Sequence, residues 1–121
     1  MRYAEMDRIA QSLTDKGPVL IFAQTYDPVM VQKLTSKVME KNGGAVCVLS
    51  GNDEAGYFYT VGQKDGDLRA LVREMNQTLG GKGGGRPYFL QGSVKADKEK
   101  VETFLKEKIP GLLVQQIQPL S

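Results

Sequence analysis

The 121-residue chain alternates short apolar runs with longer stretches in which apolar residues recur at helical spacing. Two runs, 19–23 and 45–49, are continuously apolar, which is typical of strands buried on both faces of a sheet. Between them, an Asp-Pro pair at 27–28 and an Asn-Gly-Gly sequence at 42–44 mark the beginning and the end of an amphipathic helix. A strand, helix and strand of these lengths predict a βαβ unit with parallel strands.

The rest of the chain shows the same two periodicities. Amphipathic helices are predicted over residues 3–14, 67–79 and 97–109. Further strands are predicted at residues 57–61, 88–94 and 112–117, the last two at sheet edges. We therefore expect an α/β fold: a single domain with a mixed β-sheet of about five strands, a βαβ unit and flanking helices.

A glycine-rich loop is predicted after the third helix, where residues 79–87 read Leu-Gly-Gly-Lys-Gly-Gly-Gly-Arg-Pro. Ordering a glycine costs roughly 0.5–1 kcal/mol relative to alanine in regular structure, so five of them need a reason. Either the backbone takes angles that only glycine tolerates, or another group comes very close to it. Successive backbone N–H groups can cradle an anion, and Lys82 and Arg86 add positive charge, so the loop is a candidate anion site. A helix cap alone would need only one or two glycines.

The charges support a candidate anion site only through their distribution along the chain, not through the net charge. The net charge of the chain is only +2, but residues 69–100 hold seven cations against three acids, an excess of four. The cations are Arg69, Arg73, Lys82, Arg86, Lys95, Lys98 and Lys100. Such a local excess favours a phosphate-facing surface with salt-dependent binding. The alternative is an ordinary solvated helix face, and for this reason Lys98 and Lys100 carry little weight.

Several kinds of chemistry are disfavoured. The chain has no histidine and one cysteine, Cys47, within an apolar run, so a reducing, cytoplasmic location and an inert core thiol are expected. A P-loop and a dinucleotide-binding glycine loop both lie between a strand and a helix, whereas this glycine segment follows a helix and also lacks the Ser or Thr of a P-loop, so both motifs fail on context. Tyr57, Phe58 and Tyr59 alternate between sheet faces and are expected in the core rather than in a base-stacking platform. No nucleophile has a base and no cluster has metal-ligand spacing, so a binding module without cofactor or membrane span is favoured over an enzyme.

The segment from Leu68 to Val94 resembles the DHH-associated C-terminal domain of alanyl-tRNA synthetases and AlaX-type alanyl-tRNA editing proteins. In that family a helix leads into a run of glycines, then a basic residue with proline, then a segment containing Gln and Gly. The matching positions are Gly80, Gly81, Gly83, Gly84, Gly85, Arg86, Pro87, Gln91 and Gly92. The strand, helix and strand upstream also fit, so the resemblance covers about residues 18–109.

The departures from the family pattern indicate which branch of the family the chain resembles more. Lys82 stands where many synthetases have another glycine, Ser93 replaces a second glycine after Gly92, and large residues precede Gln91. These features are nearer to the editing proteins. Related phosphoesterases place a histidine after the glycines, where this chain has Arg86, so a phosphoesterase role is disfavoured.

The resemblance implies that residues 1–16 are the end of a connector helix and residues 17–121 the DHH-associated nucleic-acid-binding domain. The zinc editing site of such proteins lies on a separate upstream domain, so this chain is not expected to be catalytic. The module would hold tRNA, with tRNA(Ala) as the expected species, while mischarged tRNA(Ala) is deacylated. The expected contact residues are Gly80, Gly81, Lys82, Gly83, Gly84, Gly85, Arg86 and Gln91. The alternative is a dimerisation or domain-docking module without direct nucleic-acid contact, and a homodimer fits either role.

Overall fold

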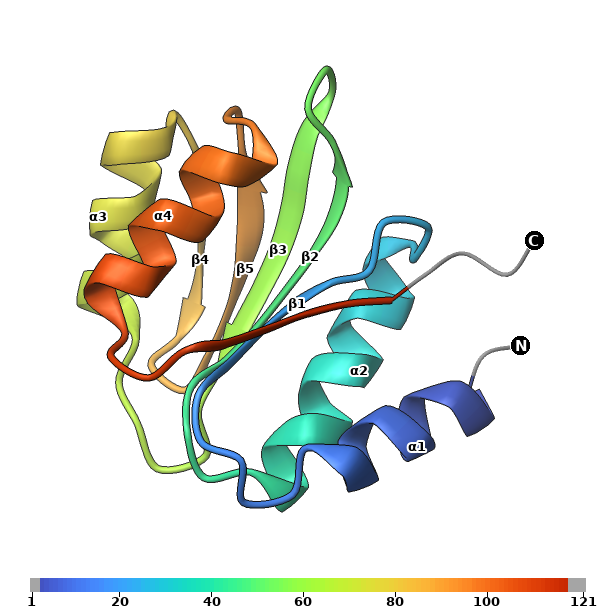
Figure 1. Ribbon diagram of the computed structural model, residues 1–121. Helices are drawn as coiled ribbons and strands as arrows, with labels where there is room; N and C mark the ends of the chain where they lie inside the picture. Colours follow the sequence, from blue (N-terminus) through green and yellow to red (C-terminus); the bar gives the residue numbers. More distant parts are fainter. Residues whose placement is uncertain (1–2, 118–121) are drawn as a thin grey trace.

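The computed structural model describes residues 3–117, which form a mixed sheet between two layers of helices (Figure 1). The helices are α1 (Tyr3–Ser12), α2 (Pro28–Lys41), α3 (Arg69–Leu79) and α4 (Lys98–Lys108). The strands are β1 (Val19–Phe22), β2 (Val46–Asn52), β3 (Gly56–Gly62), β4 (Lys82–Arg86), β5 (Phe89–Val94) and β6 (Leu113–Gln116). The strand order is β4-β5-β3-β2-β1-β6. The predicted α/β fold is confirmed, with six strands where about five were expected.

The βαβ unit forms as predicted. β1 and β2 are parallel, with Val19 opposite Val46, and α2 connects them. The α2 helix begins at Pro28 because the Asp27 carboxylate, as N-cap, accepts a hydrogen bond of 2.9 Å from the backbone N–H of Met30. On the other side of β1, β6 also pairs in parallel, whereas β2, β3, β5 and β4 pair with one another in antiparallel fashion.

Strand alternation divides the core into two layers, one on each face of the sheet. Val19 and Ile21 of β1 pack with α1 and α2, while Leu20 and Phe22 pack with α3 and α4. Figure 1 shows α3 and α4 on one side of the sheet and α1 and α2 on the other. Tyr57, Tyr59 and Cys47 are buried in the α3–α4 layer, which confirms core roles for the two tyrosines and the cysteine.

Two local predictions were wrong at one end of the sheet. The glycine segment is not a loop: residues 82–86 form β4, an edge strand paired with β5 from Lys82 opposite Ser93 to Arg86 opposite Phe89. The strand predicted at 88–94, which is β5, is in turn not an edge strand, because β4 pairs with it on the side away from β3. Glycine is depleted from strands, so its abundance masked a tight hairpin.

Within residues 3–117, no helix is both long and apolar enough to cross a membrane.

Candidate nucleic-acid interface

The β4–β5 hairpin places the two predicted cations on one face of the sheet. Directly paired residues of antiparallel strands share a face, and neighbours along a strand alternate. Lys82, Gly84 and Arg86 therefore lie on the same face as their partners Ser93, Gln91 and Phe89. The intervening residues of β5, Leu90 and Val94 among them, belong to the core layer beneath α3 and α4.

The face of this hairpin that points away from α3 is exposed to solvent. We call the five exposed residues on it, Lys82, Gly84, Arg86, Gln91 and Ser93, the open face. Helix α2 borders it, and the Gln32 Nε2 of this helix donates to the Gln91 Oε1 at 2.7 Å. The structure thus brings Lys82, Gly84, Arg86 and Gln91 together, which are four of the eight predicted contact residues.

The other glycines of the run are required by the chain itself. A Cβ at Gly83 would lie 2.7 Å from the Cα of Gly92 and closer still to the hydroxyl of buried Tyr59. A Cβ at Gly81 or Gly85 would meet the backbone of β5 equally closely. Gly80 takes a left-handed conformation, with φ +64°, and ends α3. These four glycines are explained by the fold, through a left-handed backbone or a close approach within the chain, so no ligand is needed to account for them.

Gly84 is the exception within the strand. A Cβ built there meets no atom within 4 Å, and its φ lies outside the left-handed range. Neither internal packing nor backbone strain therefore requires glycine at this position. An external group that lies flat against the strand would.

Lys82 and Arg86 are available to a ligand. Both side chains are exposed, and neither takes part in a side-chain hydrogen bond or salt bridge within the described residues. By contrast, Lys37 pairs with Asp7 at 2.6 Å, which is the main reason that the pKa of Lys37 is raised. Arg69 pairs with Asp67 at 2.6 Å, and this partner lowers the pKa of Asp67 to about 2.

The seven cations of residues 69–100 do not form a single surface, contrary to the prediction. Arg69 and Arg73 lie on α3, and Lys98 and Lys100 lie on α4, on the opposite side of the sheet from the open face. Lys98 instead sits 4.9 Å from the ring centroid of Phe22. Of the seven, the phosphate-facing candidates are thereby reduced to Lys82 and Arg86 on the open face and to Lys95, which is exposed directly after β5, together with cations that neighbouring elements supply.

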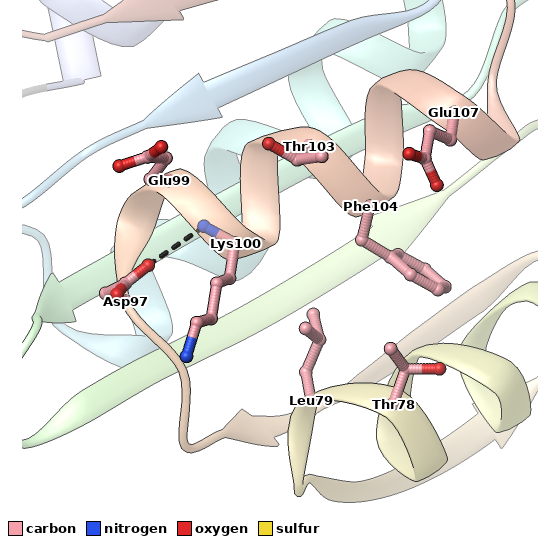
Figure 2. Close-up of a pocket in the computed structure, with 8 residues that line it drawn as sticks. All are labelled: Thr78, Leu79, Asp97, Glu99, Lys100, Thr103, Phe104 and Glu107. Carbon is pink, nitrogen blue, oxygen red and sulfur yellow. Dashed lines mark hydrogen bonds between the residues drawn. The ribbon is translucent and has the colours of Figure 1, made fainter.

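A groove of about 560 Å³ between α3 and α4 is a poor polyanion site (Figure 2). Its lining includes the carboxylates Asp97, Glu99 and Glu107 against one ammonium group, Lys100. Asp97 is already occupied as the N-cap of α4, where its carboxylate accepts from the backbone N–H of Lys100 at 2.9 Å. This groove would repel phosphate.

The sequence analysis missed a second groove, next to the open face. Phe89 and the exposed Lys33 of α2 line it, and Tyr88 stands beside it in the turn between β4 and β5. Tyr88 is 44% exposed. The signal available in the sequence was Pro87, because proline is favoured at the second position of a β-turn and here marks a turn from Arg86 to Phe89 once β4 is recognised as a strand. Within the described residues, no group of three or more His, Cys, Asp or Glu side chains could hold a metal ion.

Comparison with known proteins decides the family. The model of the DHHA1 domain matches residues 15–109. The chain belongs to the DHHA1 domain family. This confirms the resemblance drawn from the glycine, Arg-Pro and Gln-Gly positions.

The similar curated proteins are alanine–tRNA ligases. This DHHA1 domain is 31% identical over 88 residues to the enzyme of Acholeplasma laidlawii (strain PG-8A), covering 73% of this chain and 10% of the enzyme. It is 31% identical over 97 residues to the enzyme of Mycoplasma mobile, covering 77% of this chain and 11% of the enzyme. The chain thus spans about a tenth of the length of these relatives.

Two solved structures share the fold of this DHHA1 domain. The C-Ala domain of Aquifex aeolicus alanyl-tRNA synthetase superimposes with a TM-score of 0.60 at 22% identity, covering 76% of this chain and 88% of that one. RecJ of Thermus thermophilus, crystallised with Mg²⁺, gives a TM-score of 0.61 at 16% identity, covering 96% of this chain and 19% of RecJ. At these identities the likeness concerns the fold alone.

Proposed function

We propose that this DHHA1 domain is a tRNA-binding module and that its open face contacts the phosphate backbone. Lys82 and Arg86 neutralise phosphates, and the bare backbone at Gly84 lets the sugar–phosphate chain lie close between them. The observation that carries the proposal is the pairing of two free cations with the one strand glycine that the fold does not need. Such contacts position the RNA without reading its sequence.

Charge and position support this assignment. Lys82 and Arg86 are four residues apart on one strand, a separation of roughly 13 Å along the backbone, so they can serve different phosphates. Gln91 lies between them on β5, and its amide nitrogen can add a donor to phosphate or ribose. The curated relatives are alanine–tRNA ligases, which makes tRNA the expected polyanion.

A finer proposal concerns the whole polypeptide. We propose that the domain belongs to an alanyl-tRNA synthetase-like editing protein of the cytoplasm and that a catalytic domain upstream deacylates mischarged tRNA(Ala). In this view residues 1–16 are the end of the connector, residues 17–121 hold the tRNA, and the domain itself needs no cofactor. The family membership and the alanine–tRNA ligase relatives support this scheme.

The test is a double variant, Lys82→Ala with Arg86→Ala, titrated with tRNA over a range of salt concentrations. We expect weaker binding and a salt slope, dlogK/dlog[salt], that is smaller by about 1.4 to 1.8, because each lost phosphate contact removes about 0.7–0.9. The matched control is Arg73→Ala with Lys100→Ala, which removes the same charge from α3 and α4. If both double variants behave alike, the open face is not the site.

The alternative role is dimerisation or domain docking without nucleic-acid contact. β4 and β6 are both edge strands of the sheet, and an edge strand can pair with a second chain. Sedimentation velocity of the domain with and without tRNA separates the two roles. A tight dimer whose sedimentation does not change with tRNA favours the alternative, whereas a monomer or dimer that gains the mass of tRNA favours the proposed function.

A further inference from the structure

The tip of the β4–β5 hairpin presents an aromatic side chain on a rigid support. Tyr88 lies in the two-residue turn and is one of three large apolar residues that are exposed in residues 3–117, the others being Val29 and Leu113. The turn is fixed from both sides, because the Pro87 carbonyl accepts from the Leu68 N–H at 2.8 Å and the Tyr88 carbonyl accepts from the Gln63 N–H at 3.0 Å. The backbone that carries the exposed ring is therefore held in place, so stacking on the ring would require little ordering of the main chain.

The ring of Tyr88 borders a hollow between the hairpin and α2. A depression of about 240 Å³ is lined by Ser36, Met39, Tyr88 and Phe89. It adjoins a groove of about 640 Å³, which Ser36 and Phe89 also line. Val29, which is 57% exposed, stands in that groove. Two of the three exposed large apolar side chains therefore surround one connected hollow. Its combined size is sufficient for a planar ring the size of a nucleobase.

The charges around this hollow favour a polyanion. Its lining includes Lys33, Lys37 and Lys64 and a single acid, Glu40. Lys37 is already paired with Asp7, and the Lys33 ammonium lies 5.2 Å from the centroid of the Tyr3 ring, so both keep their charge at the hollow but have a partner within the chain. Phe89, which lines the hollow, is the strand partner of Arg86 and lies on the same face of the sheet, so the hollow is continuous with the open face. An apolar ring with an excess of cations around it fits a base whose own phosphates lie alongside.

We infer that Tyr88 and the hollow beside it bind an unpaired nucleobase, so the RNA segment held by this domain is single-stranded at that point. This inference rests on the proposed function and names the class of RNA it takes. A base inside a duplex has both faces stacked on its neighbours and cannot reach Tyr88. An unpaired base next to the phosphates on Lys82 and Arg86 stacks on the ring with any sequence, because every base has a π face.

The test uses the full 121-residue chain with a 12-nucleotide single-stranded RNA and a blunt 12-base-pair RNA duplex at one salt concentration. We expect the single strand to bind more tightly than the duplex. Tyr88→Ala should weaken the single strand by about 5- to 150-fold, the value of one lost base stack, and leave duplex affinity and the salt slope unchanged. Tyr88→Phe should remain near the wild type. Leu113→Ala is the matched control, because it removes another exposed apolar side chain at the far edge of the sheet.

A single 2-aminopurine in the single strand adds a direct readout, since its fluorescence falls when it stacks. Quenching by the wild type and by Tyr88→Phe, but not by Tyr88→Ala, supports the base platform. An equal effect of Tyr88→Ala on single strand and duplex overturns it. If Tyr88→Ala changes nothing while Lys82→Ala with Arg86→Ala weakens both RNAs, the inference is wrong and the proposed function stands. If neither tRNA nor the two short RNAs bind, the proposed function is wrong and the inference falls with it.

Discussion

At the scale of single residues, neighbouring glycines in one strand have different causes. Gly83 faces the interior, where the Tyr59 hydroxyl donates to the Asn76 Oδ1 at 3.0 Å and leaves no space for a methyl group. Burial raises the pKa of Tyr59, so this hydroxyl stays protonated as a donor near neutral pH. Gly84, one residue on, faces open solvent. The run of glycines therefore contains one position, Gly83, that packing requires to be glycine, and one position, Gly84, whose surface is free for binding.

This difference predicts opposite outcomes for two alanine substitutions. Gly83→Ala should destabilise the fold by about 1–3 kcal/mol, since its Cβ overlaps the backbone of β5 and the Tyr59 hydroxyl. Gly84→Ala should leave the free energy of unfolding unchanged or raise it by up to about 1 kcal/mol, because it restricts the unfolded chain. Urea unfolding measures both.

The binding consequence of Gly84→Ala tests the close approach of RNA. If the sugar–phosphate chain lies against Gly84, the added methyl group should weaken tRNA binding in a protein that is otherwise fully folded. Wild-type tRNA affinity in the stable Gly84→Ala variant would show that RNA passes at a distance and contacts only the side chains.

At the scale of elements, periodic segments were predictable and glycine-rich ones were not. The apolar stripe of α3 and the capped start of α2 follow from side-chain spacing, and both helices were predicted from it. β4 has no apolar side chain at all, since it reads Lys-Gly-Gly-Gly-Arg, so no hydrophobic alternation could reveal it. Its strand character comes from pairing with β5, a tertiary effect that overrides local propensity.

The anchoring of α4 to the β2–β3 hairpin was equally invisible to periodicity. Asp53 lies in that hairpin turn, and its carboxylate accepts from the Lys98 backbone N–H at 2.9 Å and from the Tyr57 hydroxyl at 2.7 Å. Both hydrogen bonds lower the pKa of Asp53, and the bond from the Lys98 backbone is the larger cause. A contact across 45 residues cannot be inferred from spacing along the chain.

This anchor predicts a pH dependence of stability. Because the folded-state pKa of Asp53 lies below its unfolded value of about 3.9, its contribution is present above that value and is lost as the pH falls through the folded-state pKa. Asp53→Asn keeps an acceptor but no charge, so it should be less stable than the wild type at pH 7. The difference should shrink toward zero in acid. Urea midpoints at pH 7 and at roughly pH 2–3, below the unfolded-state value, measure it. A gap that does not change with pH would contradict the assignment.

At the scale of the whole molecule, the sequence predicted the sheet and the family but not the shape of the binding surface. The excess of cations over residues 69–100 is real, yet the fold distributes those residues over both sides of the sheet. The hollow beside the open face is built with Lys33, which lies far upstream of Lys82 and Arg86 and joins them only through the three-dimensional arrangement of α2 and the hairpin. Local charge counts cannot detect such a surface.

Cys47 allows the link between this fold and RNA binding to be measured. The thiol is fully buried in β2, and burial raises its pKa to about 12, so it should react with a thiol reagent only when the domain opens. A ligand that binds only the folded state suppresses opening, by about 2.7 kcal/mol at a concentration of 100 times Kd. We therefore expect tRNA at that excess to slow labelling of the wild type by about 100-fold, provided that reclosing is faster than labelling.

The same concentration of tRNA should protect Cys47 less in the Lys82→Ala, Arg86→Ala double variant, because its Kd is higher and the ratio of ligand to Kd is therefore smaller. The Arg73→Ala, Lys100→Ala variant should keep the full protection, since its lost charges lie on the opposite side of the sheet. Labelling without tRNA provides the baseline for each protein and separates a change in stability from a change in binding. Equal protection in all three proteins would mean that tRNA stabilises the domain from some surface other than the open face.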